Sequence, residues 1–178
     1  MPATHRRPAT RGHSLVETMI ALGIASVAAG LALPGWGEAS ERRRVEGAAA
    51  ELETHFAHAR SQAVAMNRTL RLHFVSDRCY VVHTGGSSTA CSCADDGSAS
   101  CSSGAQVLQV VQWSADTPVR VLSNRSSIGF DALKGTVTPT ATVKIVGAGG
   151  TTLHNVINIM GRVRSCAPEP GLPGHTTC

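Results

Sequence analysis

The chain has 178 residues, of which 42% are hydrophobic and 16% are charged, a composition that suits one domain with or without an appendage and excludes an ordinary disordered chain. Aromatic residues make up only 3%, which argues against base stacking on aromatic side chains as the main way of binding single-stranded nucleic acid. The net charge of +4 comes largely from Arg6, Arg7 and Arg11, so binding of a polyanion elsewhere would need a local cluster of cations.

A long apolar segment follows this basic N-terminus. The residues from Thr18 to Gly37 carry no charge, and as a helix they would span a bilayer core of about 30 Å. The apolar run is longer than that of a cleaved secretory signal and lacks a clear small-x-small cleavage site, so we expect a retained membrane helix. Three arginines precede the segment and three follow it, which leaves its orientation undecided by the positive-inside rule.

Glu17 is the informative residue of this segment, because an ionisable group among apolar residues is costly and is often functional. A position at the membrane surface is the alternative. The run from Arg11 to Glu17, RGHSLVE, resembles the class III signal of type IV pilins and pseudopilins, which has a basic leader ending in Gly and a Glu at the fifth mature position. The resemblance implies cleavage of the leader 1–12 after Gly12 by prepilin peptidase, N-methylation of His13, and a role for Glu17 in assembly. His13 departs from the usual Phe or Met.

Two consecutive helical segments are expected after the leader. Segment 13–37 would be the transmembrane and filament-core helix, in which Pro34 marks a place where the helix can kink or melt. Segment 38–67 is predicted as an amphipathic helix ending near Asn67. Its apolar stripe comprises Val45, Ala48, Ala49, Leu52, Phe56, Ala59, Ala63 and Met66.

From residue 68 onward the pattern indicates strands, and we expect a β-domain over 68–178. Leu70, Leu72 and Phe74 alternate with polar residues, which is typical of a half-buried strand. Further strands are expected at Cys79–His83, Val107–Trp113, Val119–Leu122, Ser127–Phe130, Thr142–Val146 and Leu153–Ile159. The Gly/Ser-rich segment 84–104 is predicted to be a long exposed loop. The fold class is therefore α+β, with a long N-terminal helix packed on an antiparallel sheet or small sandwich, as in type IV pilins.

The features that resemble enzyme motifs are weak. Gly147–Gly150 superficially resembles a dinucleotide-binding turn, but a strand-like segment follows instead of the helix that would hold the pyrophosphate, so we expect a hairpin turn. The eight histidines form no recognisable motif with a nucleophile. We expect neither an enzyme nor a cofactor.

Six cysteines lie after the apolar segment, at Cys79, Cys91, Cys93, Cys101, Cys166 and Cys178. Metal binding is one reading, but the spacing is irregular for a structural zinc site, and an oxidising location favours disulfides over a metal. Fifteen pairings are possible. We favour Cys166 with Cys178, which would close the tail 167–177, with the other four cysteines pairing among themselves to tie down the loop.

The most specific feature of the β-domain is the sequence Gly161-Arg162-Val163-Arg164. In an extended chain Arg162 and Arg164 point to the same side, with few acidic residues nearby until Glu169, and two such guanidinium groups form a clamp for phosphate. A surface pair of arginines without a ligand is the alternative.

Together with the class III signal, the long helix and the β-domain, this motif resembles the FimT/GspH family over essentially the whole chain. GRxR resembles the DNA-binding motif of FimT-type minor pilins, which act in DNA uptake during natural transformation. The resemblance implies that Arg162 and Arg164 contact DNA phosphates and that Gly161 shapes the loop. Apart from the resemblance, Arg125, Lys134 and Lys144 are additional cationic candidates in the sequence. The alternatives are a GspH-type pseudopilin of type II secretion and a structural minor pilin that initiates pilus assembly.

The resemblance also implies partners and a location. The expected partners are other major and minor pilins, prepilin peptidase, double-stranded DNA, and the inner membrane before assembly. The chain would be a single-pass inner-membrane protein with a periplasmic C-terminal domain, and it would become extracellular once assembled in a pilus.

Overall fold

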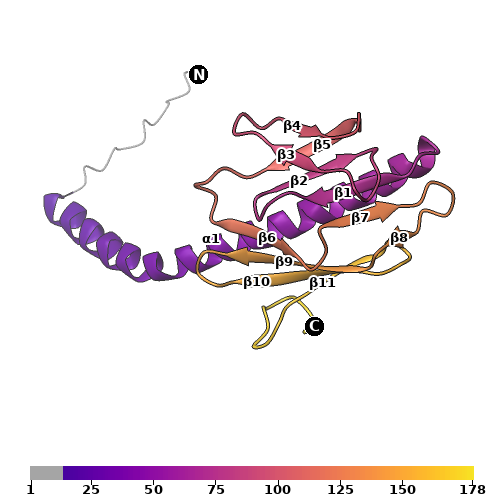
Figure 1. Ribbon diagram of the computed structural model, residues 1–178. Helices are drawn as coiled ribbons and strands as arrows, with labels where there is room; N and C mark the ends of the chain where they lie inside the picture. Colours follow the sequence, from indigo (N-terminus) through magenta and orange to yellow (C-terminus); the bar gives the residue numbers. More distant parts are fainter. Residues whose placement is uncertain (1–13) are drawn as a thin grey trace, which may run out of the picture. The chain divides into compact units, whose positions relative to one another are not determined.

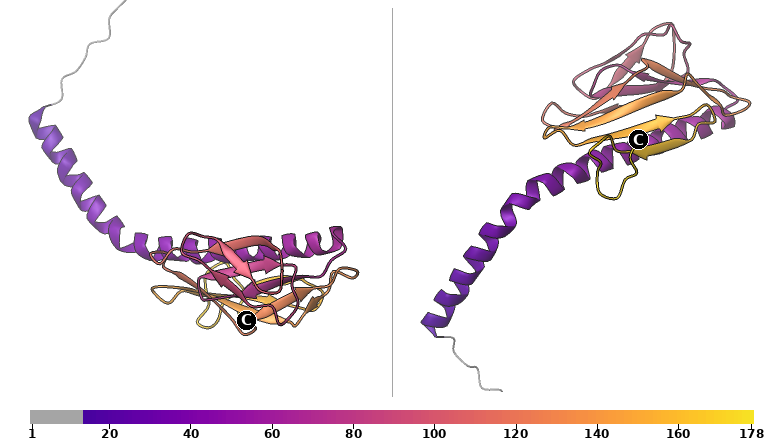
Figure 2. Two further views of the ribbon diagram at one scale, coloured as in Figure 1. Left: turned by 45° about the horizontal axis from the view of Figure 1, so that its top comes forward. Right: turned by 90° about the horizontal axis from the view of Figure 1, so that it is seen from below.

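The computed structural model describes residues 14–178, apart from the side chains at 29 and 31–35, so Gly12 and His13 lie outside the described residues. The chain divides into two compact units, of which the second comprises Ala39–Cys178 and contains the whole β-domain. Figure 1 and Figure 2 show one long helix and the layers of strands. Within the described part of the chain, no helix combines the length and apolar character needed to cross a membrane.

The helix α1 extends from Leu15 to Ala65 without interruption. The backbone stays helical through Pro34, so the helix does not melt there. The chain leaves the helix at Asn67, whose φ of 48° is left-handed and whose N–H, with that of Arg68, bonds to carbonyls of the last turn. The helix thus ends two residues before Asn67, which takes the left-handed position after it because asparagine tolerates this conformation better than most residues.

Two antiparallel sheets and a small hairpin make up the β-domain. The first sheet has the order β5 (Val107–Gln112), β2 (Cys79–His83), β1 (Leu70–Phe74), β7 (Ser127–Phe130), β8 (Val137–Thr138). The second has the order β11 (Val163–Cys166), β10 (Thr152–Ile157), β9 (Ala141–Gly147), β6 (Val119–Ser123). The strands β3 (Cys91–Cys93) and β4 (Ala99–Cys101) pair only with each other. The expected α+β, pilin-like fold is confirmed.

One hydrophobic core joins the helix to both sheets. The expected stripe of α1 is buried from Val45 to Ala63, whereas Met66 lies beyond the helix and is exposed. Phe56 packs edge-to-face on Phe130 of the first sheet, with ring centroids 4.7 Å apart. Because every residue of this core lies between Val45 and Ala167, the unit Ala39–Cys178 has the hydrophobic core it needs to fold on its own.

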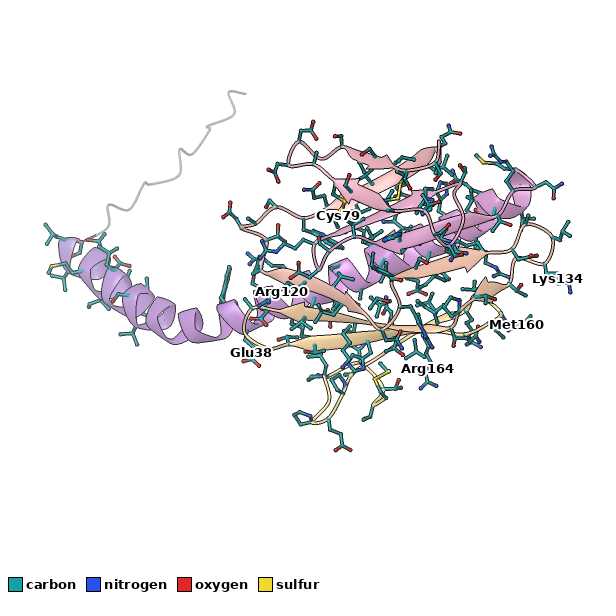
Figure 3. All side chains as sticks on the ribbon, viewed as in Figure 1. Glu38, Cys79, Arg120, Lys134, Met160 and Arg164 are labelled. Atoms are coloured by element: carbon teal, nitrogen blue, oxygen red, sulfur yellow. A yellow bond between two sulfur atoms is a disulfide. The ribbon has the colours of Figure 1, made fainter. Side chains whose placement is uncertain are left out.

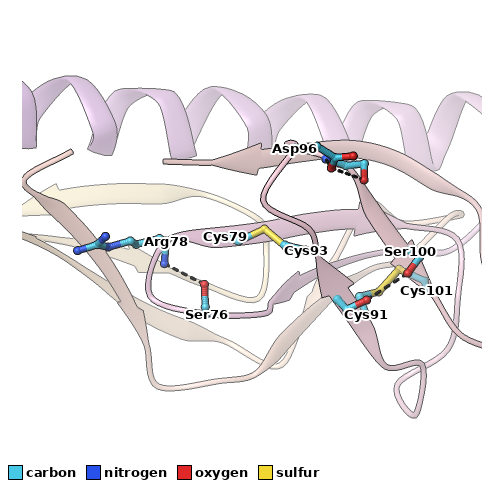
Figure 4. The surroundings of a disulfide bond; sticks show 10 residues. Ser76, Arg78, Cys79, Cys91, Cys93, Asp96, Ser100 and Cys101 are labelled. Carbon is cyan, nitrogen blue, oxygen red and sulfur yellow. Dashed lines mark hydrogen bonds between the residues drawn. A yellow bond between two sulfur atoms is a disulfide. The ribbon is translucent and has the colours of Figure 1, made fainter. Parts of the chain in front are cut away.

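The segment 84–104 differs from the expected exposed loop. It contains the hairpin β3–β4, and Thr89 within it is buried. Disulfides link Cys91 to Cys101 across the hairpin and Cys79 of β2 to Cys93 (Figure 4). The covalent bonds explain why the hairpin forms although its sequence has no apolar alternation: the disulfides supply the restraint that burial supplies elsewhere.

The third disulfide joins Cys166 to Cys178, the expected pairing, and closes the C-terminal tail. The tail also contacts α1, because Arg42 donates to the carbonyl of Pro173 and His175 lies 3.3 Å from the carboxylate of Glu46. Arg42 bonds to the same carboxylate and lowers the pKa of Glu46. The tail is therefore fastened at its end and along its length.

Candidate nucleic-acid interface

The GRVR motif begins in the tight turn that joins β10 to β11, and its last two residues, Val163 and Arg164, belong to β11. Asn158 organises the turn: its carbonyl accepts from the N–H of Gly161, its side-chain oxygen accepts from the N–H of Arg162, and its own N–H donates to the carbonyl of Arg162. Every one of these bonds is local, so the position of Arg162 is set by the turn itself. Asn158 is a residue that the sequence analysis did not single out.

Gly161 is needed in this turn for two physical reasons. Its φ is +73°, a left-handed conformation that a side chain disfavours. A Cβ at this position would also lie 3.0 Å from the side chain of Arg60 and 3.1 Å from a methyl group of Val137. Glycine therefore lets the turn approach α1 and β8 closely.

Arg162 and Arg164 are both exposed and line one shallow hollow together with Val156 and Asn158. Arg164 pairs with Val156 across the two strands, which places both side chains on the outer face of the second sheet (Figure 3). Among the described residues, neither guanidinium forms a salt bridge with a carboxylate. The two charges are thus available to a ligand from solvent.

The register of the second sheet extends this positive face. Lys144 of β9 pairs with His154 of β10 and with Leu122 of β6. Arg120 precedes Leu122 by two residues in β6, so its side chain lies on the same face. Arg120 and Lys144 are exposed. The four strands contain no Asp or Glu. Arg120 was missed in the sequence because only the pairing register shows that it shares a face with Arg164.

The inner face of the same sheet fixes β11 in place. Asn155 is fully buried; its amide donates to the carbonyl of Ala49 in α1, and its oxygen accepts from the hydroxyl of Ser165. The side chain of Asn155 therefore connects the strand that carries Arg164 to the helix.

His154 lies on the opposite, outer face of β10. Burial, and then the positive charge of Lys144, lower the pKa of His154.

The remaining candidates lie elsewhere. Lys134 lies in the connection between β7 and β8, beside a groove that Gly161 also lines, and Arg125 lies in the turn after β6. Glu17 lies in the first turn of α1. The turn at Gly147–Gly150 joins β9 to β10 as expected, and the carboxylate of Glu41 accepts from the N–H groups of Gly149 and Thr151 there, so these donors are already used.

Comparison with known proteins gives two findings. The family described as Type II transport protein GspH matches residues 48–161. Two crystal structures of the type IV minor pilin FimU of Pseudomonas aeruginosa strain PAO1 share the fold. One aligns with a TM-score of 0.55 at 21% identity, covering 73% of this chain and 96% of FimU. The other aligns with a TM-score of 0.51 at 20% identity, covering 70% and 97%.

No curated protein matches the chain in sequence. The family match nevertheless spans more than half of the 178 residues, and the aligned part of the chain has the fold of a solved minor pilin. The chain therefore belongs to the GspH family of minor pilins and pseudopilins, whose members assemble with other pilin subunits in type IV pili or type II secretion systems.

Proposed function

We propose that the chain is a minor type IV pilin that binds double-stranded DNA through phosphate contacts and serves DNA uptake in natural transformation. The observation that carries the proposal is the pair of exposed guanidinium groups of Arg162 and Arg164, which line one hollow at the edge of the second sheet. Arg120 and Lys144 lie farther along the same outer face, and the four strands of this sheet contain no acidic residue. Guanidinium groups bind phosphate oxygens in two-pronged geometry, and such contacts carry little sequence information. Binding is therefore expected to be weak and insensitive to base sequence.

The test uses the fragment 39–178, which contains the complete hydrophobic core. Replacing Arg162 and Arg164 by Gln removes two charges from exposed positions, so we expect a folded domain with strongly reduced affinity for duplex DNA. The plot of log K against log salt concentration has a negative slope, and each lost phosphate contact makes this slope less steep by about 0.9. Gel-shift titrations at several salt concentrations measure both quantities, and circular dichroism verifies the fold.

A matched control separates the motif from bulk charge. Arg43 and Arg44 are also exposed, on α1, and their replacement by Gln changes the net charge by the same amount. The control variant is expected to bind DNA nearly as the parent does. If the two double variants lose equal affinity, or if the GRVR variant binds like the parent, the motif is not the binding site.

The type II secretion role is the second candidate, and the GspH family match favours it. That match ends at Gly161, so it includes neither Arg162 nor Arg164. Deletion of the gene in its host separates the two functions: loss of transformation with intact secretion supports the pilus, and the reverse supports the secretion system. If the protein is instead a structural minor pilin, deletion of its gene should abolish pilus assembly, and replacement of Arg162 and Arg164 should not affect assembly.

We further propose that the protein reaches the filament by the route of other pilins. The leader 1–12 would be removed after Gly12, His13 would be methylated, and Glu17 would act in assembly after insertion in the inner membrane with the β-domain in the periplasm. A bulky residue in place of Gly12 should block maturation, whereas Glu17→Ala should leave cleavage intact and impair entry into the filament. Intact-mass analysis of the membrane form decides this, and a mature protein that starts elsewhere than His13 contradicts it.

A further inference from the structure

Three basic side chains gather on the face of the first sheet that is turned away from α1. Arg71 and His73 are two residues apart on β1, and Arg71 pairs directly with His83 of β2, so all three share one face. His83 is fully buried, and the other two are partly buried. The opposite face of these strands contributes Leu70, Leu72 and Val82 to the hydrophobic core. The three basic groups are thus separate from the sheet that carries GRVR.

The hairpin β3–β4 adjoins this cluster. The sulfur of Cys91 and ring nitrogens of His73 and His83 lie within 4.8 Å of one another, and the disulfide from Cys79 ties the hairpin to β2 (Figure 4). Gly85, just before the hairpin, also has no room for a side chain, because a Cβ there would lie 2.9 Å from the ring of His83 and closer still to Thr89. The covering segment is therefore held close over the basic groups.

Polar atoms of all three side chains are buried without a hydrogen-bond partner, namely Nε of Arg71, Nδ1 of His73 and Nε2 of His83. Arg71 uses another nitrogen to donate to the hydroxyl of Ser127, and Gly129 leaves room for its guanidinium. Within residues 14–178, no carboxylate forms a salt bridge with Arg71. Arg71 is partly buried with its Nε shielded from solvent, and withdrawing a cation from water without a counter-charge is costly, so the cluster is suited to receiving a negative group.

A metal ion is the obvious rival, since two histidines and a cysteine lie together. Three observations oppose it. Cys91 is bonded to Cys101 and has no thiolate to offer. The N–H of Gly85 donates to Nδ1 of His83 at 2.9 Å, so the neutral ring carries its proton on Nε2, where a metal would have to bind. The positive charge of Arg71, which lowers the pKa of both histidines after the larger effect of burial, would also repel a cation.

We propose that Arg71, His73 and His83 form a binding site for a small inorganic anion, such as chloride or one oxygen of phosphate, beneath the disulfide-linked hairpin. Arg71 Nε–H and His83 Nε2–H are donors as they stand. Burial lowers the pKa of His73, and a hydrogen bond with the backbone of Thr89 opposes that effect; because Nδ1 of His73 has no partner, protonation gives it a donor at Nδ1. Binding is therefore coupled to a proton and tightens as pH falls. Of the three groups, the two histidines titrate near neutral pH, whereas Arg71 stays charged, and the cysteines of the hairpin are in disulfides.

Histidine ring nitrogens of the fragment 39–178 report on the site directly by NMR. Chloride and phosphate are titrated separately at constant ionic strength, which is balanced with a bulky organic sulfonate. We expect saturable shifts of the His73 and His83 nitrogens, a raised pKa of His73, and tighter binding at pH 6 than at pH 8. The arm that saturates at the lower concentration identifies the anion. Shifts that never saturate, or no shifts at all, overturn the proposal.

Two variants and a metal control sharpen the test. Arg71→Gln should weaken anion binding about tenfold or more, because a charge-assisted hydrogen bond is lost, whereas Arg71→Lys should retain part of it. Arg43→Gln removes the same charge from an exposed position on α1 and should bind the anion like the parent. Circular dichroism verifies each fold, and the titration of the unmodified fragment stands without the variants. If the histidine nitrogen signals shift at micromolar Zn²⁺ and do not shift on addition of anions, the cluster is a metal site instead.

Discussion

Substitution of Gly161 by Ala tests whether crowding at the GRVR turn fixes the position of the two arginines. The new Cβ would lie 3.0 Å from Cδ and Nε of Arg60 and 3.1 Å from Val137, and Nε of Arg60 is held by a 2.7 Å bond to the carbonyl of Gly135. The left-handed backbone alone costs about 1–2 kcal/mol for a residue with a side chain. Overpacking against these neighbours adds about 1–3 kcal/mol.

Gly104→Ala supplies the matched control. Its φ of +67° is close to the +73° of Gly161, but a Cβ there would meet nothing within 4 Å. The control should therefore lose only the backbone contribution, and Gly161→Ala should lose at least about 1 kcal/mol more. Urea denaturation of the fragment 39–178 measures both losses, and gel shifts should show weaker DNA binding for Gly161→Ala although its charge is unchanged. Equal losses of stability for the two variants, with unchanged DNA affinity, would refute the reasoning.

The remaining predictions concern stability, and all are measured on the same fragment by urea denaturation. Asn155→Ala removes two buried hydrogen bonds and should destabilise the domain by about 2–4 kcal/mol, clearly more than Ser165→Ala, which removes one; equal losses would contradict the linking role of the amide. Replacing Cys166 and Cys178 by Ser opens a ring with a sequence separation of 12 residues and should cost about 2–3 kcal/mol, and a cost near zero would mean that the contacts with α1 alone hold the tail. Burial lowers the pKa of His73, His83 and His154, so the stability that these neutral histidines contribute is fully present above about pH 6.5 and is lost as pH falls below it. The urea midpoint should therefore be lower at pH 5 than at pH 7.5, and an unchanged urea midpoint would contradict this.

The sequence predicts the helices and strands whose apolar residues recur with the spacing of that element, every three or four residues in a helix and every second residue in a strand. The strand at Leu70–Phe74 was predicted because its apolar residues alternate, and the structure buries Leu70 and Leu72. The hairpin β3–β4 was missed because serine, alanine and cysteine give no such alternation, and its pairing depends on covalent bonds between distant residues. The strand β11 was missed because its four residues, Val163–Cys166, are too few to show an alternating apolar pattern, and it pairs on one side only, at the edge of the sheet.

The sequence predicts which side chains of the GRVR motif could bind phosphate, but it does not predict which other residues share their face. The GRVR motif identifies two guanidinium groups on one side of an extended chain, and the structure places both at one hollow. The contribution of Arg120 depends on strand order and register, which join residues far apart in the sequence. The cluster around Arg71 and His83 has the same origin, since only the pairing of β1 with β2 brings them together.

The closed C-terminal tail changes what a protease could do to this protein. Its exposed turns, such as the one around Glu169 and Gly171, are the kind of surface segment that proteases cut first. Because Cys166 and Cys178 are bonded, a single cut between them would release no fragment, and the piece carrying Cys178 would stay attached to β11. Such a nicked molecule would separate into two chains only under reducing conditions, so a protein cleaved once in its tail would still keep every strand of its β-domain.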